Sequence, residues 1–115
     1  MKKDDLIRFR HMKEAAQESF LFIQGKSQRD LHKDRMLTLA LMKCFEIIGE
    51  AASKVSSETR SKYPQFPWAE IIGMRNRLIH AYFDINLQLV WDTIQIDLPL
   101  LMTLLDNILS QENDD

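Results

Sequence analysis

The chain has 115 residues, of which 45% are hydrophobic and 28% are charged, and its formal net charge is −2 at pH 7. This length suits one domain with its own apolar core, and no apolar stretch is long enough to cross a membrane. The N-terminal residues MKKDDLIRFRH lack the apolar run of a secretory signal, and the single cysteine, Cys44, has no partner for an intrachain disulfide. We therefore expect a single domain over residues 1–115 in a reducing cytoplasm.

The N-terminal segment predicts a helix. Apolar residues recur every three or four positions from Leu6 to Ile23, which places them on one helical face. Asp4 or Asp5 can cap its N-terminus. Gly25 can end it, because glycine tolerates the backbone conformation that follows a helix.

A second helix is predicted over residues 31–55, after a polar connector over residues 26–30 in which Ser27 or Asp30 can serve as the cap. Its apolar residues cover nearly every direction around the helix axis. Such a helix belongs in the middle of a bundle or at an oligomer interface.

The C-terminal half predicts further helices. Residues 56–64 begin with a serine pair and end at a proline, which allows one short helix. A long last helix is expected over residues 87–108, capped by Asp84 or Asn86, with apolar residues at alternating steps of three and four. Pro99 lies within this pattern and should kink the helix without ending it. The sequence has no strand-like alternation, so the patterns together predict an all-α protein.

Charge is divided unevenly along the chain. All 15 Lys and Arg residues lie in residues 1–77, whereas residues 78–115 carry seven acidic residues and no Lys or Arg. A basic part can form a binding face for a polyanion such as nucleic acid. Because helices fold back on one another, this division of the sequence need not become a division of the surface, and both interpretations stay open.

The segment with the densest functional chemistry runs from Pro67 to Tyr82. Pro67 suits the first turn of a helix, and Ile71, Met74 and Leu78 continue to Tyr82 as one apolar stripe. Several kinds of polar side chain stand within about two turns of the same segment. They are Arg75, Asn76, Arg77, His80 and Tyr82. This segment is therefore the candidate functional site.

Arg75 and His80 are five residues apart, which is about 140° around a helix at about 100° per residue. They therefore do not share a face, and they can converge only if the helix ends near His80 or if a second copy of the chain supplies the missing group. Asn76 is the i, i+4 neighbour of His80 and can orient its ring. No acidic or thiol residue stands at metal-ligand spacing from these groups, so neither a metal site nor a cofactor is expected.

Two interpretations of this cluster stay open on chemistry alone. In the structural one, Arg75 pairs with Glu46 or Glu50, His80 caps a helix C-terminus and Tyr82 closes the core. In the functional one, the cluster cleaves RNA without a metal. A histidine then moves the proton of a ribose 2′-hydroxyl or of the leaving 5′-oxygen, while an arginine holds the phosphate and stabilises the transition state. DNA lacks this nucleophile and would not be a substrate.

The order of the motifs resembles a known family. Residues 75–82 (RNRLIHAY) are similar to the R-x4-6-H motif, in its R-N-x3-H-x-Y form, of HEPN domains of the HepT type. Residues 47–52 (IIGEAA) are similar to that family's I-G-E-A segment, residues 67–74 (PWAEIIGM) to its P-W-x-x-I-x-G-M segment, and residues 84–99 to its last helix. The resemblance thus covers most of the chain.

This resemblance implies an all-α, antiparallel HEPN bundle of four to five helices, and a homodimer in which the two motifs face one another. It also implies an endoribonuclease toxin of a type VII-like toxin–antitoxin pair, with RNA such as tRNA or mRNA as its substrate. Arg75 and His80 would be the catalytic pair and Asn76 their support. Tyr82 would be the residue to which a partner nucleotidyltransferase antitoxin of the MNT type transfers AMP. The added AMP would block the site and repel an RNA phosphate.

Glu50 corresponds to the acid of the family's I-G-E-A segment. It either supports Arg75 or His80, or it pairs structurally at a site where Gly49 permits close helix packing, and we favour the structural role. Arg77 is assigned no family role. Two other functions are weighed against the toxin. One is a non-catalytic helical subunit that presents a substrate or RNA to a nucleotidyltransferase, and the other is a helical dimer whose polar cluster is only structural.

Overall fold

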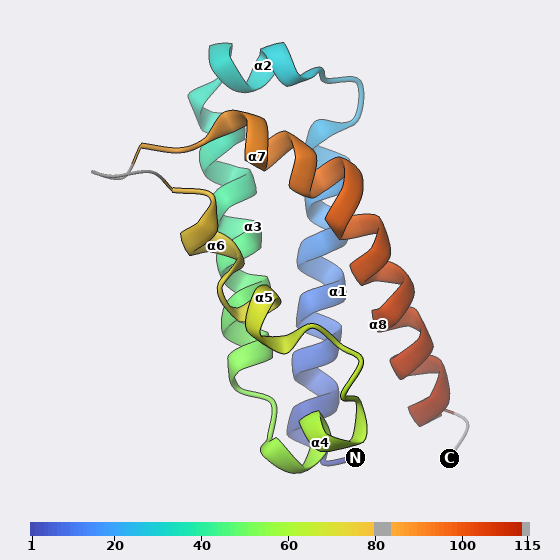
Figure 1. Cartoon of the computed structure of the whole chain (residues 1–115). Coiled ribbons are helices and arrows are strands. Elements are labelled where there is room, and N and C mark those ends of the chain that lie inside the picture. The colour runs from blue at the N-terminus through green and yellow to red at the C-terminus, as the bar shows by residue number, and fades with distance from the viewer. Residues whose placement is uncertain (80–83, 114–115) are drawn as a thin grey trace.

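The computed structural model describes residues 1–79 and 84–113, and its elements within these ranges are helices, with one isolated antiparallel bridge between Ile79 and Ile85. The prediction of an all-α bundle is confirmed (Figure 1). In chain order the elements are α1 (Lys3–Ile23), α2 (Gln28–Lys33), α3 (Arg35–Ser53), α4 (Ser57–Lys62), α5 (Trp68–Ile72), α6 (Met74–Arg77), α7 (Leu87–Asp92), the π-helical turn η2 (Thr93–Asp97) and α8 (Leu98–Asn113).

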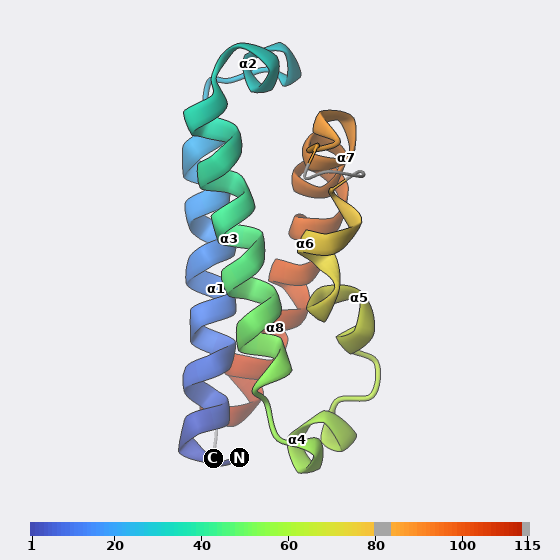
Figure 2. The ribbon, with the colours of Figure 1, turned by 90° about the vertical axis from the view of Figure 1, so that its left-hand side faces the viewer.

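Three long helices form the body of the molecule. α1 and α3 lie side by side along its length, and α8 packs against α1 (Figure 1). The short helices α5 and α6 lie against α3 on the side away from α1 (Figure 2). α2 lies at one end of the bundle, where it contacts α7, and α4 lies at the other end. Helix α3 therefore lies between two layers, α1 on one side and the α5–α6 segment on the other. The segment that holds the candidate site packs against α3.

The first helix has the predicted extent. α1 ends two residues before Gly25, whose φ of 75° lies in the left-handed region that favours glycine. The predicted cap by Asp4 or Asp5 is wrong, because the N-cap is Lys2 and makes no side-chain hydrogen bond to the helix. The buried carboxylate of Asp5 instead accepts hydrogen bonds from Ser56, just before α4. Asp5 thus joins two helices.

The long helix predicted over residues 31–55 is two helices, α2 and α3, which meet at Asp34. Ser27 and Asp30 form a capping box at the start of α2. The carboxylate of Asp34 accepts a hydrogen bond of 3.1 Å from the backbone N–H of Leu37 and so caps α3. Because a side chain that satisfies the first N–H groups of a helix marks its beginning, Asp34 starts a new helix here.

The last predicted helix is present, with an irregular turn inside it. Asn86 is the cap, since its side chain accepts a hydrogen bond of 3.1 Å from the N–H of Leu89. The π-helical turn η2 directly precedes α8, whose second residue is Pro99. Proline cannot donate a backbone hydrogen bond, and its ring clashes with the carbonyl group four residues earlier in a regular α-helix. A wider π-helical turn before Pro99 accommodates the ring. The helix bends at this region and continues past Pro99, as predicted (Figure 1).

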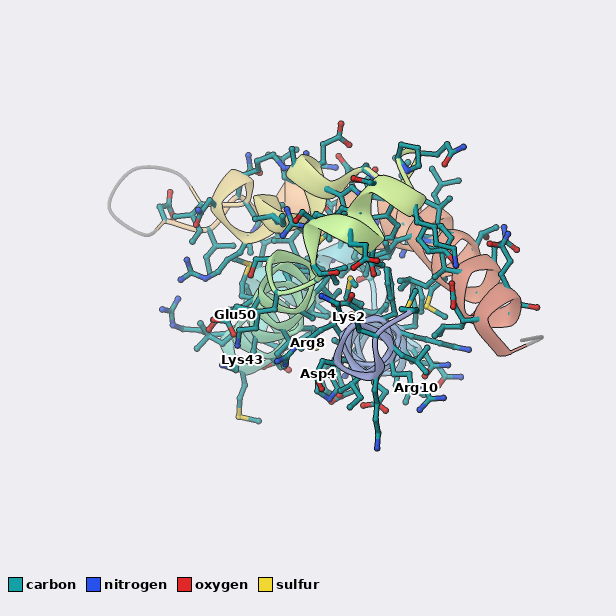
Figure 3. The ribbon with its side chains drawn as sticks, turned by 90° about the horizontal axis from the view of Figure 1, so that it is seen from below. Lys2, Asp4, Arg8, Arg10, Lys43 and Glu50 are labelled. Atoms are coloured by element: carbon teal, nitrogen blue, oxygen red, sulfur yellow. The ribbon has the colours of Figure 1, made fainter. Side chains whose placement is uncertain are left out.

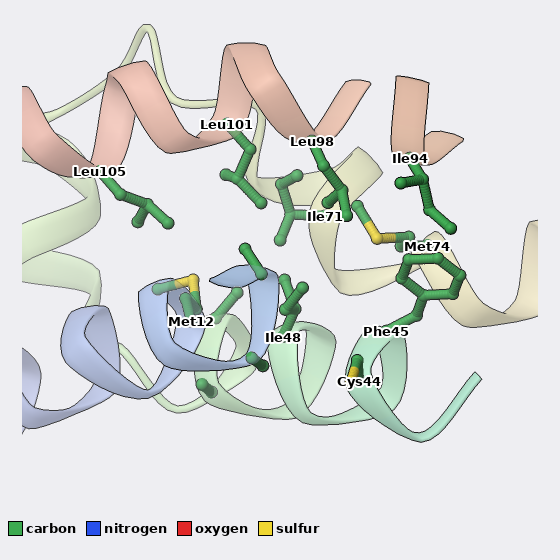
Figure 4. Close-up of a cluster of buried hydrophobic side chains, with 14 of the residues drawn as sticks. Met12, Cys44, Phe45, Ile48, Ile71, Met74, Ile94, Leu98, Leu101 and Leu105 are labelled. Carbon is green, nitrogen blue, oxygen red and sulfur yellow. The ribbon is translucent and has the colours of Figure 1, made fainter. Parts of the chain in front are cut away.

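Fully buried side chains from both layers meet in one core (Figure 4). Phe45 and Ile48 of α3 are 0% exposed. Met74 of α6 and Ile94 of η2 are 1% exposed. The other fully buried large side chains are Phe9, Met12, Leu41, Val90, Leu98 and Leu105. Met74 directly precedes Arg75, so the core fixes the backbone from which the arginine extends.

The uneven charge of the sequence is partly balanced across the fold. Lys13 of α1 forms an ion pair of 2.8 Å with Asp106 of α8, and Lys62 forms one of 2.7 Å with Glu112. Seen from below, charged side chains extend from several sides of the bundle (Figure 3). Acidic residues of the C-terminal part therefore lie beside cations of the N-terminal part. This favours the interpretation in which the uneven charge of the sequence does not become an uneven surface charge.

Candidate active site

Arg75 is held between two buried anchors. Met74 is 1% exposed and Leu78 is 3% exposed, whereas the side chain of Arg75 is 41% exposed. Residues three or four apart lie on the same side of a helical turn, so the anchoring of Met74 and Leu78 in the core turns the residues between them outward. Asn76 and Arg77 are both exposed for the same reason.

The apolar stripe predicted one helix from Pro67 onward, and this is wrong because the helix is interrupted. α5 ends at Ile72, a new helix begins at Met74 after Gly73, and that helix ends at Arg77. Glycine has the lowest helix propensity of all residues except proline, so ending a helix at Gly73 costs little free energy. Beyond α6, Ile79 forms an isolated antiparallel bridge with Ile85. The separation of about 140° between positions 75 and 80 assumed one continuous helix, so it no longer applies.

A cleft lies between α3 and the α5–α6 segment. Its volume is about 330 Å³, and it is lined by Phe45, Glu46, Gly49, Glu50, Ser53, Ile72, Arg75 and Asn76. Gly49 makes the close approach of these helices possible, because a Cβ atom at this position would lie 3.0 Å from the carbonyl oxygen of Ile72. Three of the predicted site residues, Glu50, Arg75 and Asn76, therefore meet in one cleft.

The guanidinium of Arg75 has partners on two sides. Its Nε lies 3.7 Å from Oε2 of Glu46, and its Nη1 donates a long hydrogen bond of 3.5 Å to Oδ1 of Asn76. The other oxygen of Glu46, Oε1, lies 3.4 Å from Nζ of Lys43. Of the two carboxylates considered as partners of Arg75, Glu46 is therefore the one in contact with it. Glu50 lines the same cleft and forms no ion pair within the described part of the chain.

Arg77 extends away from this cleft. Its Nη2 donates a hydrogen bond of 3.2 Å to the carbonyl oxygen of Glu70, at the other side of the α5–α6 segment. Together with Asp97 and apolar residues of α8 it lines a separate hollow of about 160 Å³. The geometry thus gives Arg77 a contact within its own segment and no place in the Arg75 cleft.

His80 and Tyr82 lie outside the described residues. The predicted roles of His80 as catalytic partner, of Asn76 as the residue that orients it, and of Tyr82 as an AMP acceptor therefore stay predictions. Ile79 is the last described residue before them, and it is half-buried.

Several groups outside the cleft, within the described part of the chain, have shifted pKa values. Burial raises the pKa of Asp5, but hydrogen bonds from Ser56 and Thr59 outweigh it, so the pKa is lowered overall. Burial, and then a hydrogen bond to Glu112, raise the pKa of Tyr63. Burial also raises the pKa of the Cys44 thiol, which keeps it protonated. These shifts follow from packing at the ends and in the core of the bundle.

Glu46 is a residue of the cleft that the sequence did not single out. From the sequence it was only one of two possible structural partners for Arg75. The signal was the spacing, since Glu46 precedes Glu50 by four residues and so shares its helical face. Lys43, whose Nζ contacts the second oxygen of Glu46, lies three residues before Glu46 on the same helical face.

The fold and the cleft define a small all-α domain with an arginine, an amide and two carboxylates in one open site. The family model for "Ribonuclease HepT-like" matches residues 12–108. The chain therefore belongs to the HepT-like ribonuclease family. This confirms the predicted family resemblance and the prediction that the protein is a ribonuclease.

Known relatives support this assignment. A "Putative RNase" of Caldanaerobacter subterraneus subsp. tengcongensis is 42% identical over 90 residues, which cover 78% of this chain and 80% of that protein. A "Putative RNase" of Methanocaldococcus jannaschii is 35% identical over 86 residues, which cover 75% of this chain and 79% of that one. A "Probable ribonuclease HepT" of Thermococcus cleftensis is 37% identical over 68 residues, or 59% of this chain and 62% of that protein. The comparison with solved structures gave no match.

The described ranges hold neither a metal-binding cluster nor a membrane-spanning helix. Within residues 1–79 and 84–113, no group of three or more His, Cys, Asp or Glu side chains is placed to hold a metal ion. No helix in these ranges is both long enough and apolar enough to span a membrane. The expectation of a metal-free reaction rests on the chemistry of the motif and stays a prediction.

Proposed function

We propose that this chain is a cytoplasmic endoribonuclease that cleaves RNA without a metal ion, with Arg75 and His80 as its catalytic pair. The observation that carries the proposal is the position of Arg75. It extends from a backbone fixed in the core into an open cleft, and it lies within the residues that match a ribonuclease family. A permanently charged guanidinium at such a place suits an RNA phosphate, which it can bind through two parallel hydrogen bonds.

The proposed reaction is a transesterification followed by proton transfer. The neutral imidazole of His80 accepts the proton of a ribose 2′-hydroxyl, and the 2′-oxygen then forms a bond to the adjacent phosphorus. The bond from phosphorus to the 5′-oxygen breaks, and this oxygen takes a proton from an imidazolium. The products are a 2′,3′-cyclic phosphate and a 5′-hydroxyl. Arg75 stabilises the negative charge that grows on the phosphoryl oxygens.

A homodimer would bring a second imidazole to the leaving group. The outer face of α3 supports this part of the proposal, because Met36 is 81% exposed and Leu39 is 46% exposed. The same face continues at helical spacing through Lys43 and Glu46 to Glu50, and Lys43 and Glu50 lie on one side of the helix (Figure 3). An exposed apolar face of this kind suits contact with a second copy, and it leads directly into the cleft.

Neutralisation by AMP transfer is the regulatory part of the proposal. A partner nucleotidyltransferase antitoxin would join the phenolic oxygen of Tyr82 to the α-phosphorus of ATP, with loss of the phenolic proton and release of pyrophosphate. The bulk and negative charge of AMP would then oppose an RNA phosphate near Arg75. The support for Tyr82 is its place in the motif. Intact mass measurement of wild type and Tyr82→Phe after incubation with ATP and the partner tests it, and equal gains on both would remove Tyr82 as the acceptor.

Expression in a bacterial host separates this proposal from a non-catalytic subunit. Wild type should slow growth and fragment RNA, whereas Arg75→Ala and His80→Ala should be harmless at equal protein levels. Purified wild type should also cleave RNA in the presence of EDTA. If all three proteins are equally harmless and none of them cleaves RNA, a subunit that only presents RNA or a substrate to a nucleotidyltransferase is the better account.

A further inference from the structure

The carboxylate of Glu46 bridges two cations at the edge of the cleft. Oε2 lies 3.7 Å from Nε of Arg75, and Oε1 lies 3.4 Å from Nζ of Lys43. The side chain of Glu46 is 35% exposed, so water reaches it and the pairs contribute little to the stability of the fold. Its presence beside the phosphate-binding arginine of a ribonuclease needs another explanation, because a carboxylate repels RNA.

The explanation lies in which edge of the guanidinium Glu46 contacts. Its contact is with Nε, and among the described residues no carboxylate contacts the edge formed by the two terminal nitrogens. The hydrogen bond at this edge within those residues runs from Nη1 to Oδ1 of Asn76, at 3.5 Å. An arginine binds a phosphate bidentately when two nitrogens of one edge face it, so a partner on Nε fixes the side chain without occupying that edge.

We propose that Glu46 is a positioning residue that orients Arg75 for the scissile phosphate. The inference rests on the proposed function, because it assigns Glu46 a role through Arg75. Nζ of Lys43 lies 3.4 Å from the second carboxylate oxygen of Glu46 and gives it a partner on the side away from Arg75. The carboxylate thus weakens the attraction between the cleft and RNA, and in return the guanidinium is already oriented when the phosphate arrives.

A competing account makes the opposite kinetic prediction. If Glu46 only occupied Arg75 until RNA displaced it, removing the negative charge would raise kcat/KM and leave kcat unchanged. If Glu46 oriented Arg75, the same change would lower kcat, because the loss would be felt in the transition state. Whether kcat falls or stays unchanged therefore distinguishes the two accounts.

The test is the steady-state kinetics of Glu46→Gln on a single-stranded RNA, at a temperature well below the unfolding transition of every variant. Glutamine keeps the size of the side chain and removes its charge. We expect kcat to fall about tenfold, as a misplaced catalytic group commonly costs that much or more, while KM stays equal or falls. The control is Glu14→Gln, an exposed carboxylate of α1 outside the cleft lining, which should match wild type. An unchanged or higher kcat for Glu46→Gln would overturn the inference.

A double variant checks that the effect passes through Arg75. In the background of Arg75→Lys, which lacks the Nε group, Glu46→Gln should have little further effect on kcat. Losses that multiply in the double variant would mean that Glu46 acts elsewhere. The two proposals also fail in different ways. RNA cleavage that depends on Arg75 but not on Glu46 refutes only the positioning role, whereas a wild-type protein without ribonuclease activity refutes both.

Discussion

The carboxylate of Asp5 binds Ser56, a residue 51 positions further along the chain. It accepts a hydrogen bond of 2.9 Å from the backbone N–H of Ser56 and one of 2.6 Å from its hydroxyl, and a third of 2.6 Å comes from Thr59. Asp5 is only 3% exposed. This contact ties the first turn of α1 to the start of α4, and α4 leads into the segment that carries the candidate site.

Loss of this carboxylate should destabilise the fold. Asp5→Ala removes three charge-assisted hydrogen bonds and leaves their donors with fewer partners, so the free energy of unfolding should fall by about 2–3 kcal/mol. Urea denaturation measures it. Asp4→Ala is the matched control, because its exposed side chain lies next to Asp5, and it should change the free energy by less than about 0.5 kcal/mol. Equal effects of the two changes would contradict the assigned role.

The same carboxylate makes stability depend on pH. Its pKa in the folded protein lies below the ordinary value of 3.8, so the unfolded chain binds the proton more readily as the pH falls. The contribution of Asp5 is complete above pH 3.8 and is lost as the pH falls through the lower, folded pKa. Asp5→Asn should therefore lose less stability than wild type on acidification below this pH, as urea midpoints at several pH values will show. Parallel losses in the two proteins would refute the linkage.

The sequence alone predicted the parts of the fold that depend on local patterns. The all-α class, the end of α1 before Gly25 and the cap at Asn86 all follow from periodicity and from residues with strong local preferences. The division of the second helix at Asp34 escaped prediction, because apolar residues continue on both sides of it and only the cap marks the boundary. Long-range contacts such as that of Asp5 leave no local signal.

The candidate site was predicted to a similar extent. The motif identified Arg75 and Asn76, and the structure places both in one cleft with Glu50. The break at Gly73 was missed because the apolar stripe stays in phase across it, so periodicity gave no warning. The contact between Arg75 and Glu46 depends on how α6 lies against α3, which no spacing within either segment determines.

Gly49 should be required for the geometry of the cleft. In Gly49→Ala the new Cβ atom would lie 3.0 Å from the carbonyl oxygen of Ile72, and the backbone of α5 must move to relieve this contact. We expect a loss of about 1–3 kcal/mol in the free energy of unfolding, together with weaker RNA cleavage by the folded fraction. Gly73→Ala is the comparison, since its Cβ would lie 3.3 Å from the carbonyl oxygen of Ala69, and it should cost less. A stable and fully active Gly49→Ala variant would contradict the close packing.

The exposed face of α3 should control assembly. Leu39→Glu places a charge on the apolar part of this face. If the proposed dimer forms through this face, the charge would be buried at the interface, so the variant should be monomeric. Sedimentation velocity measures the distribution. Leu21→Glu is the control, because Leu21 is 66% exposed and belongs to α1 instead. A wild-type protein that is monomeric at all accessible concentrations would refute the α3 interface.

The most direct test of the account is cleavage of a short RNA that carries one 2′-deoxynucleotide. Purified wild type in EDTA should cleave the all-ribose oligonucleotide and leave a 2′,3′-cyclic phosphate at the cut, and 2′-deoxy substitution should abolish cleavage at that position alone. Arg75→Ala should lower the rate by at least about 100-fold, since it removes the group that stabilises the phosphoryl charge. Cleavage that persists at the deoxy position, or that proceeds equally well in Arg75→Ala, would contradict the account.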